Sequence, residues 1–138
     1  MGRFLAIDHG EKRIGLAISD PNKIISKPLK TLFLTDFKHF FQELLEIINE
    51  YDIEKLIIGL PKGMDGKKTE QTIKAEVFKK DIEKRVDIPI VMFDERLSSV
   101  SAKKSLISQG IKTGYNKSKI DQTAAAIFLQ HYLETINY

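Results

Sequence analysis

The fold is decided first by residues 3–19, which read RFLAIDHGEKRIGLAIS. This stretch holds two short apolar runs, over residues 3–8 and 14–19, with Gly10 between them. Apolar runs that flank a glycine are typical of a β-hairpin, so we expect two strands joined by a turn at Gly10. Asp20-Pro21-Asn22 marks another turn, after which residues 29–34 are expected to form a third strand.

The middle of the chain predicts a helix and then a buried strand. Asp36 is a good N-cap residue, and the apolar residues after it recur at helical spacing as far as Tyr51. Residues 56–60 are a continuous apolar run that Pro61 stops, which is typical of a central parallel strand.

In the second half, residues 69–85 are expected to form a helix and residues 90–93 a strand. A short helix is expected from Ser98 or Ser99 to Gly110, and a last helix from Ser118 onward. Three strands that form an antiparallel meander are thus followed by two strands that alternate with helices. This order predicts an α/β fold, in which a mixed five-stranded sheet (the meander plus two parallel strands) is flanked by helices on both faces.

Helical spacing also predicts core side chains. In the helix over 69–85 these are Ile73, Val77, Phe78 and Ile82, and in the last helix they are Ala124, Ala125, Phe128, Leu129, Tyr132 and Leu133. The three histidines have no spacing typical of metal ligands. We expect His9 in a turn, and all three at the surface or its boundary.

Composition limits the class of protein. The chain has 138 residues, which predicts a single domain over 1–138. Its residues are 42% hydrophobic and 30% charged, and this composition argues against a disordered chain, a collagen-like fibre and a membrane span. Cysteine is absent, which excludes disulfides and thiolate chemistry. Without a signal-peptide pattern, a cytoplasmic protein is expected. The net charge of +3 favours anionic partners mildly, although lysine-rich solubility explains it equally simply.

Three acids stand out by position. Asp8 ends the first strand, Glu95 follows the last strand, and Asp121 has the helical spacing of the inward alanines. An inward carboxylate is costly unless it is paired or binds a metal ion. Ligands of open α/β sheets collect at the carboxyl ends of strands. We therefore hypothesise that the three acids converge and bind Mg²⁺ or Mn²⁺, with room for two ions about 3.5–4 Å apart as in phosphodiester cleavage.

Each acid also has a simple structural explanation. Asp8 is able to start the turn that follows it, and Asp121 fits a capping box with Ser118. Glu95 is able to pair with Arg96 or a lysine. Sequence order does not show whether the three acids meet.

Four motifs in order resemble the YqgF/RuvX family of pre-16S rRNA nucleases and Holliday junction resolvases. They are residues 8–17 with Ser19-Asp20, residues 59–61 with 64–66, residues 94–99, and residues 116–121 followed by Ala124-Ala125. The resemblance covers essentially the whole chain. It departs at Ser101, near which the family often has a glutamate.

The resemblance implies an RNase H-like fold and an active site made of Asp8, Glu95 and Asp121. The implied reaction is hydrolysis of phosphodiesters in structured nucleic acid by metal-activated water, with the three acids as metal ligands. Maturation of the 5′ end of the 16S rRNA precursor is the leading function, with ribosomal particles as possible partners.

Basic residues are candidates for nucleic-acid binding. The forked donors of Arg13 and Arg96 match phosphate oxygens, although either arginine is equally able to form a structural ion pair. Two loops carry lysines that would follow a nucleic-acid backbone or remain solvated: Lys62, Lys67 and Lys68 in one, and Lys112, Lys117 and Lys119 in the other.

Three other functions compete with rRNA maturation. A Holliday junction resolvase would use the same chemistry on a four-way DNA junction and would act as a two-fold dimer. The sequence does not identify a dimer surface and fits either a monomer or a homodimer. A non-catalytic nucleic-acid or ribosome-associated binding protein would gain nothing from three added acids. A sugar-kinase-like ATPase normally needs two lobes, and this length supplies one.

Overall fold

The computed structural model describes residues 2–10, 12–60, 69–94 and 117–136, with side chains throughout except at Leu60 and residues 117–122. In chain order the elements are β1 (Arg3–His9), β2 (Arg13–Ser19), β3 (Ser26–Phe33), α1 (Phe37–Glu50), β4 (Ile53–Leu60), α2 (Glu70–Glu83), β5 (Ile90–Asp94) and α4 (Lys117–Ile136). The helix predicted over 98–110 lies outside the described residues.

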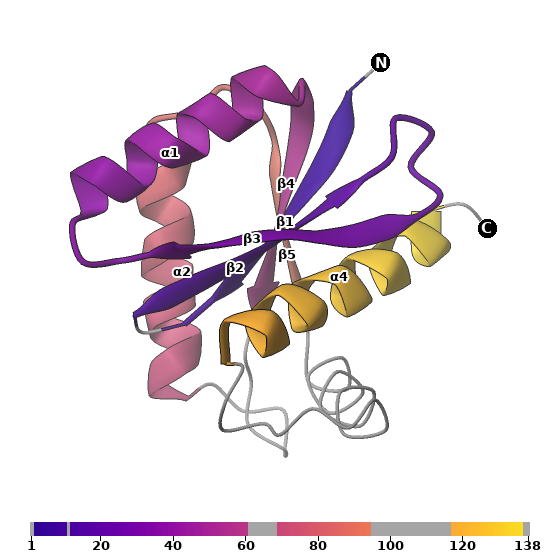
Figure 1. Ribbon diagram of the computed structural model, residues 1–138. Coiled ribbons are helices and arrows are strands. Elements are labelled where there is room, and N and C mark those ends of the chain that lie inside the picture. The colour runs from indigo at the N-terminus through magenta and orange to yellow at the C-terminus, as the bar shows by residue number, and fades with distance from the viewer. Residues whose placement is uncertain (1, 11, 61–68, 95–116, 137–138) are drawn as a thin grey trace.

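The strands form one mixed sheet in the order β3-β2-β1-β4-β5, as predicted (Figure 1). β2 is antiparallel to β1 and β3, whereas β1, β4 and β5 run parallel, with Ile7 opposite Ile58 and Ile57 opposite Val91. The three parallel strands therefore end at the same edge of the sheet, which we call the carboxyl edge.

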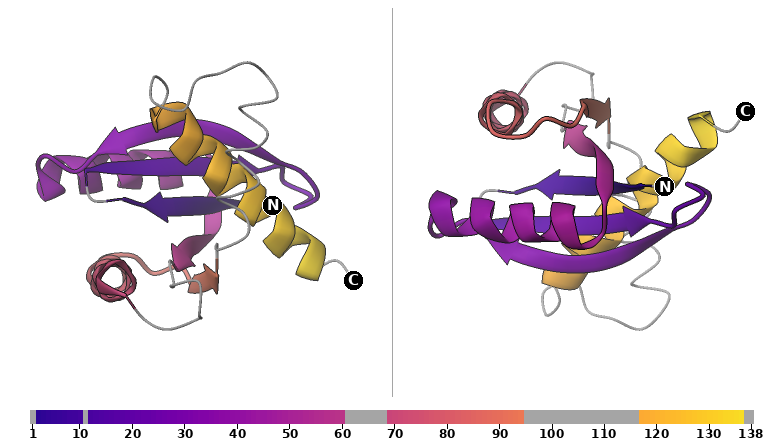
Figure 2. Two further views of the ribbon diagram at one scale, coloured as in Figure 1. Left: turned by 90° about the horizontal axis from the view of Figure 1, so that it is seen from below. Right: turned by 90° about the horizontal axis from the view of Figure 1, so that it is seen from above.

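Helices cover both faces of the sheet, also as predicted (Figure 2). The face under α1 and α2, here the helix-pair face, is built from large side chains such as Leu5, Leu16 and Phe40. The face under α4, here the α4 face, combines the small residues Ala6 and Ala17 with Phe4 and Ile57. This alternation follows from the pleat, which sends successive residues of a strand to opposite faces.

Local signals fix the turns and helix starts. The carboxylate of Asp36 accepts the backbone N–H of Lys38 at 3.0 Å, so Asp36 is the N-cap of α1 as predicted. The N–H of Gly10 donates to the carbonyl of Arg13 at 3.0 Å, and a Cβ at Gly10 would lie 2.6 Å from that oxygen. Only glycine fits this turn without a shift of the backbone.

Two predictions for elements were wrong. β3 begins at Ser26 rather than residue 29, because its pairing with β2 continues to the Ser19–Ser26 pair. In α2, Phe78 and Ile82 are buried as predicted, but Ile73 and Val77 are 55% and 54% exposed. The buried stripe runs through Thr72 and Ala75 instead. These smaller side chains let α2 approach the sheet, and the two β-branched residues are left at the margin of the contact.

His9 is also placed differently from the prediction. It is the last residue of β1, not a turn residue, and its ring lies against Phe78 of α2 with 4.5 Å between ring centroids. His39 and His131 are exposed, as predicted. No helix within the described ranges is long and apolar enough to cross a membrane.

Candidate active site

Asp8 lies at the carboxyl edge of the sheet, one residue before β1 ends. Its neighbours at alternate positions, Phe4 and Ala6, belong to the core of the α4 face. The pleat therefore places Asp8 on the α4 face, where it is half-buried. The predicted position of this acid, at the end of a buried strand, is confirmed.

Glycines flank Asp8 on both neighbouring strands. Gly15 of β2 is its partner in the antiparallel register. On β4, Ile58 pairs with Ile7, so Gly59 is the next residue alongside Asp8. Neither glycine has a side chain to cover the carboxylate. Glycine inside a strand often marks the close approach of a ligand, a signal that the sequence analysis used only as a motif match.

α4 runs across the same face and is fixed to the sheet far from its first turn. Its alanines and Phe128 are buried against β1 and β2. The side chain of Gln130 accepts the N–H of Ser26 and donates to the carbonyl of Ile24, both at 3.0 Å. These contacts fix the axis of α4 and hence where its first turns begin.

Asp121 is in the first half of α4, one turn before Ala125. Its side chain lies outside the described part of the structure. Ser118 is the second residue of α4 and already helical, whereas an N-cap residue has non-helical backbone angles. The side chain of Ser118 lies outside the described part as well, so the capping box and the inward, metal-binding role both stay predictions for Asp121.

The remaining predicted site residues are only partly covered by the structure. Glu95 and Arg96, which follow Asp94 at the end of β5, lie outside the described residues, as do Lys62, Lys67, Lys68 and Lys112. Lys117 and Lys119 are placed in the first turn of α4 without described side chains. Among the side chains that are described, no three His, Asp or Glu residues meet as a metal site.

Arg13 begins β2 and shares the α4 face with Gly15, two residues further along the same strand. It is half-buried. Because Asp8 pairs with Gly15, Arg13 is placed beyond Asp8 toward the turn at Gly10. The structure thus brings Asp8, Arg13 and the two glycines to one corner of the α4 face.

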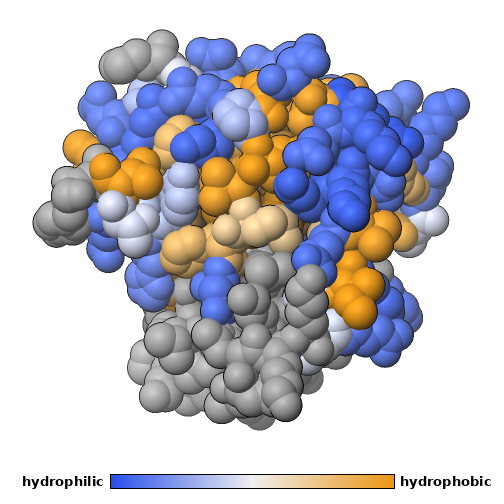
Figure 3. Space-filling view, turned by 180° about the vertical axis from the view of Figure 1, so that it is seen from behind, coloured by the Kyte–Doolittle hydropathy of each residue, from blue (hydrophilic) through white to orange (hydrophobic). Residues whose placement is uncertain are grey.

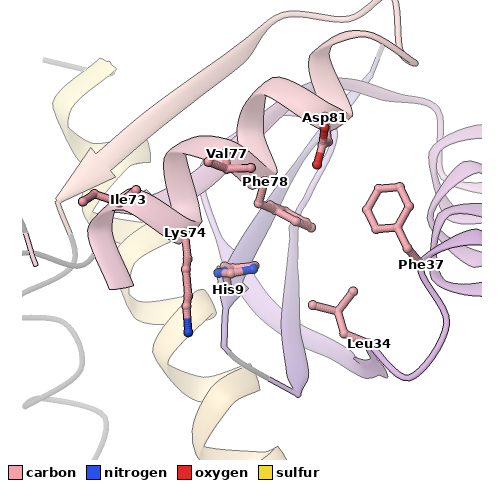
Figure 4. A pocket seen from close by; sticks show the side chains of 8 residues that line it. All are labelled: His9, Leu34, Phe37, Ile73, Lys74, Val77, Phe78 and Asp81. Atoms are coloured by element: carbon pink, nitrogen blue, oxygen red, sulfur yellow. The ribbon is translucent and has the colours of Figure 1, made fainter. Parts of the chain in front are cut away.

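The opposite face has a different arrangement at the same edge. There His9 lines a pocket of about 430 Å³ between α2 and Phe37, the first residue of α1 (Figure 4). Its Nδ1 is buried without a hydrogen-bond partner in the described part of the chain. Burial and then the charge of Lys74 lower the pKa of His9 to about 4. The imidazole is therefore neutral near pH 7.

Sequence reasoning missed this pocket because it assigned two of its lining residues, Ile73 and Val77, to the core. The other residues that line it are His9, Leu34, Phe37, Lys74, Phe78 and Asp81. The surface seen from behind shows apolar patches between hydrophilic regions rather than a uniformly polar coat (Figure 3). The available signal was the spacing of Thr72, Ala75, Phe78 and Ile82, which is a complete helical stripe without Ile73 and Val77.

Comparison with solved structures supports the fold. The chain matches the crystal structure of the Fowlpox virus resolvase with its substrate Holliday junction DNA, with a TM-score of 0.59 and 13% identity over 99% of both chains. It matches Thermus thermophilus RuvC in complex with a Holliday junction substrate with a TM-score of 0.53 and 14% identity, over 99% of this chain and 96% of that one. The fold is RNase H-like, as the motif resemblance implied.

Sequence comparison identifies the family. A protein from Maridesulfovibrio salexigens named "Putative pre-16S rRNA nuclease" is 42% identical over 95% of this chain and 97% of its own length. A protein of the same name from Roseiflexus is 36% identical over 97% of this chain and 95% of its own. The family model described as "RuvX: Holliday junction resolvase" matches residues 2–135. The chain therefore belongs to the RuvX family and is a nuclease of the RNase H-like fold.

Proposed function

We propose that this nuclease cleaves structured RNA in the cytoplasm and matures the 5′ end of the 16S rRNA precursor, with residues 1–138 acting as one catalytic domain. The observation that carries the site is the position of Asp8, on the α4 face at the carboxyl edge, between Gly15 and Gly59. The names of the most similar relatives support the choice of substrate.

We infer that Asp8, Glu95 and Asp121 hold Mg²⁺ or Mn²⁺. Three carboxylates form the hard, all-oxygen donor set that these ions prefer. The surroundings of Asp8 fit such a group, because the residues beside it on β2 and β4 are glycines without side chains. When bound, the ions would lower the pKa of the attacking water and stabilise the leaving oxygen.

The chain's own groups then bind and orient the substrate. The guanidinium groups of Arg13 and Arg96 donate hydrogen bonds to phosphate oxygens and hold the scissile group against Asp8. The lysines of the two basic segments, Lys62, Lys67, Lys68, Lys112, Lys117 and Lys119, neutralise neighbouring phosphates, so binding weakens steeply with salt.

A second candidate substrate is a four-way DNA junction. The description of the matching family and the resolvase structures of similar fold favour it. Symmetric cleavage of a junction needs two active sites related by a two-fold axis, and hence a homodimer. RNA processing has no such requirement and fits a monomer.

The test compares the wild type with Asp8→Asn and Asp36→Asn. Each protein is incubated with Mg²⁺ or Mn²⁺ and labelled RNA that carries the extended 5′ end of 16S rRNA, and in parallel with a labelled four-way DNA junction. Asp36→Asn is the matched control, because it also removes one carboxylate but keeps a good N-cap residue for α1.

We expect Asp8→Asn to reduce RNA cleavage roughly hundredfold or more, because charge stabilisation in the transition state is lost. Asp36→Asn should cleave like the wild type. Paired, symmetric nicks in the junction with intact RNA would instead identify a resolvase. Tight RNA binding without Asp8-dependent cleavage of either substrate would make the protein a non-catalytic binding module.

A further inference from the structure

The pocket on the helix-pair face lies directly across the sheet from the candidate active site. His9 and Asp8 are consecutive residues of β1, so the pleat sends their side chains to opposite faces at the same edge. The pocket is therefore separate from the acid site, yet one residue away from it along the strand. Its volume, about 430 Å³, falls within the usual range for small-ligand sites.

The walls of the pocket suit a flat, apolar group. Phe37 of α1 supplies partly exposed aromatic surface, whereas Phe78 of α2 is 5% exposed and lies against His9 at the base of the pocket (Figure 4). Val77 and Ile73 complete the α2 wall and are more than half exposed, so the pocket is open to solvent. An aromatic ring that enters would replace solvent against these side chains.

The polar groups of the pocket lie at defined places along its length. Nδ1 of His9 is buried without a hydrogen-bond partner among the described residues, and a buried acceptor left unpaired is costly. Lys74 lies beside His9, whereas Asp81 is seven residues further along α2, about 10 Å away along the helix axis. The end of the pocket at His9 and Lys74 is thus suited to a group that carries both an N–H donor and an anion.

We propose that this pocket binds one unpaired nucleobase of the RNA substrate. The base lies against Phe37 and the exposed α2 wall of Ile73 and Val77, donates an N–H to Nδ1 of His9, and leaves its phosphate near Lys74. Unpaired bases in RNA are commonly recognised by stacking on aromatic side chains and by hydrogen bonds to their edges. An apolar side chain from a protein partner would leave Nδ1 of His9 unpaired, which makes it the poorer occupant.

This inference rests on the proposed function and deepens it. The substrate would cross the carboxyl edge, with its scissile phosphate at Asp8 on one face and a neighbouring base at His9 on the other. The nuclease would then select RNA with an unpaired nucleotide beside the cleavage point. A fully paired duplex would lack this contact.

Binding to RNA tests the pocket apart from cleavage. Fluorescence anisotropy would measure the Kd of the full chain, in EDTA so that no cleavage occurs, for a labelled single-stranded oligonucleotide and for versions with one abasic nucleotide at successive positions. Val77→Trp fills the pocket from an exposed position. Ile24→Trp, at a residue 56% exposed on the β2–β3 turn, is the matched control.

We expect Val77→Trp to weaken binding about fivefold or more, the size expected for loss of one stacked base. One abasic position should weaken binding to the wild type by a similar factor and leave Val77→Trp unaffected. His9→Phe, which keeps a ring against Phe78, should weaken binding about threefold, whereas His39→Phe should not. Lys74→Ala should weaken it more than Lys80→Ala, which removes another α2 lysine.

Two results would separate this inference from the proposed function. If all variants bind every oligonucleotide equally while Asp8→Asn abolishes cleavage, the base pocket is wrong and the nuclease stands. If the abasic effect depends on Val77 but no Asp8-dependent cleavage of RNA occurs, the pocket stands and the proposed reaction is wrong.

Discussion

The two faces of the sheet are covered in opposite ways, although the same strands supply both. On the α4 face a single helix packs on the sheet, and alanines such as Ala6 and Ala125 are mixed there with large residues such as Phe128. On the helix-pair face two helices pack on large residues such as Leu16 and Phe40, and the pocket remains open at the carboxyl edge. β1 contributes Asp8 to the first face and His9 to the second.

The difference shows how one strand separates two kinds of chemistry. Glycines flank the carboxylate of Asp8, so a hard, hydrated ligand is able to approach it. Aromatic rings surround His9, so its surroundings suit a flat organic group. The pleat alone keeps these environments apart, because neighbouring residues of a strand cannot share a face.

The largest effect is expected from a cavity in the helix-pair face. Phe40 is fully buried, and its ring lies 5.7 Å from that of Phe78. Phe40→Ala should reduce the free energy of unfolding by about 3–5 kcal/mol, measured by urea denaturation. Phe40→Leu should reduce the free energy of unfolding much less, because it leaves a smaller cavity. An equal loss for both variants would mean that this face is not packed around the ring.

The α4 face should respond instead to added volume. Ala125 is a fully buried residue of α4, in the same core cluster as Ala6, Ala17 and Phe128. Ala125→Leu should destabilise the protein by up to about 3 kcal/mol, because the helix cannot move away from the sheet without losing its other contacts. Lys80→Leu, which puts a leucine at an exposed helix position without adding volume, serves as the control. A neutral Ala125→Leu would show that the α4 face is loosely packed.

The pKa of His9 predicts a pH dependence of stability in the metal-free protein. Burial lowers this pKa to about 4, against 6.5 for an unperturbed histidine, so the unfolded chain binds the proton first as the pH falls. The contribution of neutral, buried His9 to the free energy of unfolding is therefore fully present above pH 6.5 and is lost as the pH falls toward 4. In EDTA, the wild type should lose about 2 kcal/mol more than His9→Phe between about pH 7.5 and pH 5.

The comparison of urea denaturation curves at the two pH values isolates this contribution, because the carboxylates titrate in both proteins. Identical pH dependence of the wild type and His9→Phe would show that His9 is solvated as readily in the folded protein as in the unfolded chain.

The smallest effect is expected at the open rim of the pocket. Ile73 is more than half exposed, whereas Ile82 in the same helix is fully buried. Ile73→Ala should change the free energy of unfolding by less than about 1 kcal/mol, and Ile82→Ala should cost about 2–5 kcal/mol. Thermal or urea denaturation of both variants measures the difference. Similar losses would restore the original assignment of Ile73 to the core.

The elements and the sheet were predictable from the sequence because each depends on nearby residues. Gly10 is required by contact with Arg13, three residues away, and Asp36 caps the helix that it precedes. The uninterrupted apolar run over residues 56–60 indicated a strand buried on both faces, and β4 is parallel to both of its neighbours. Hydrophobic periodicity and turn residues carry this information locally.

Tertiary structure alone decided which side chains share a corner. Asp8 lies beside Gly59 because β1 and β4 pair in one register, although 51 positions separate them in the chain. The spacing in α2 allowed two inward stripes, one with Ile73 and Val77 and one with Thr72 and Ala75, and the contact of the helix with the sheet decided for the second. The sequence determined which segments form strands and helices and which acids lie at the ends of those segments. Long-range packing decided that Asp8 lies between two glycines and that His9 faces a pocket.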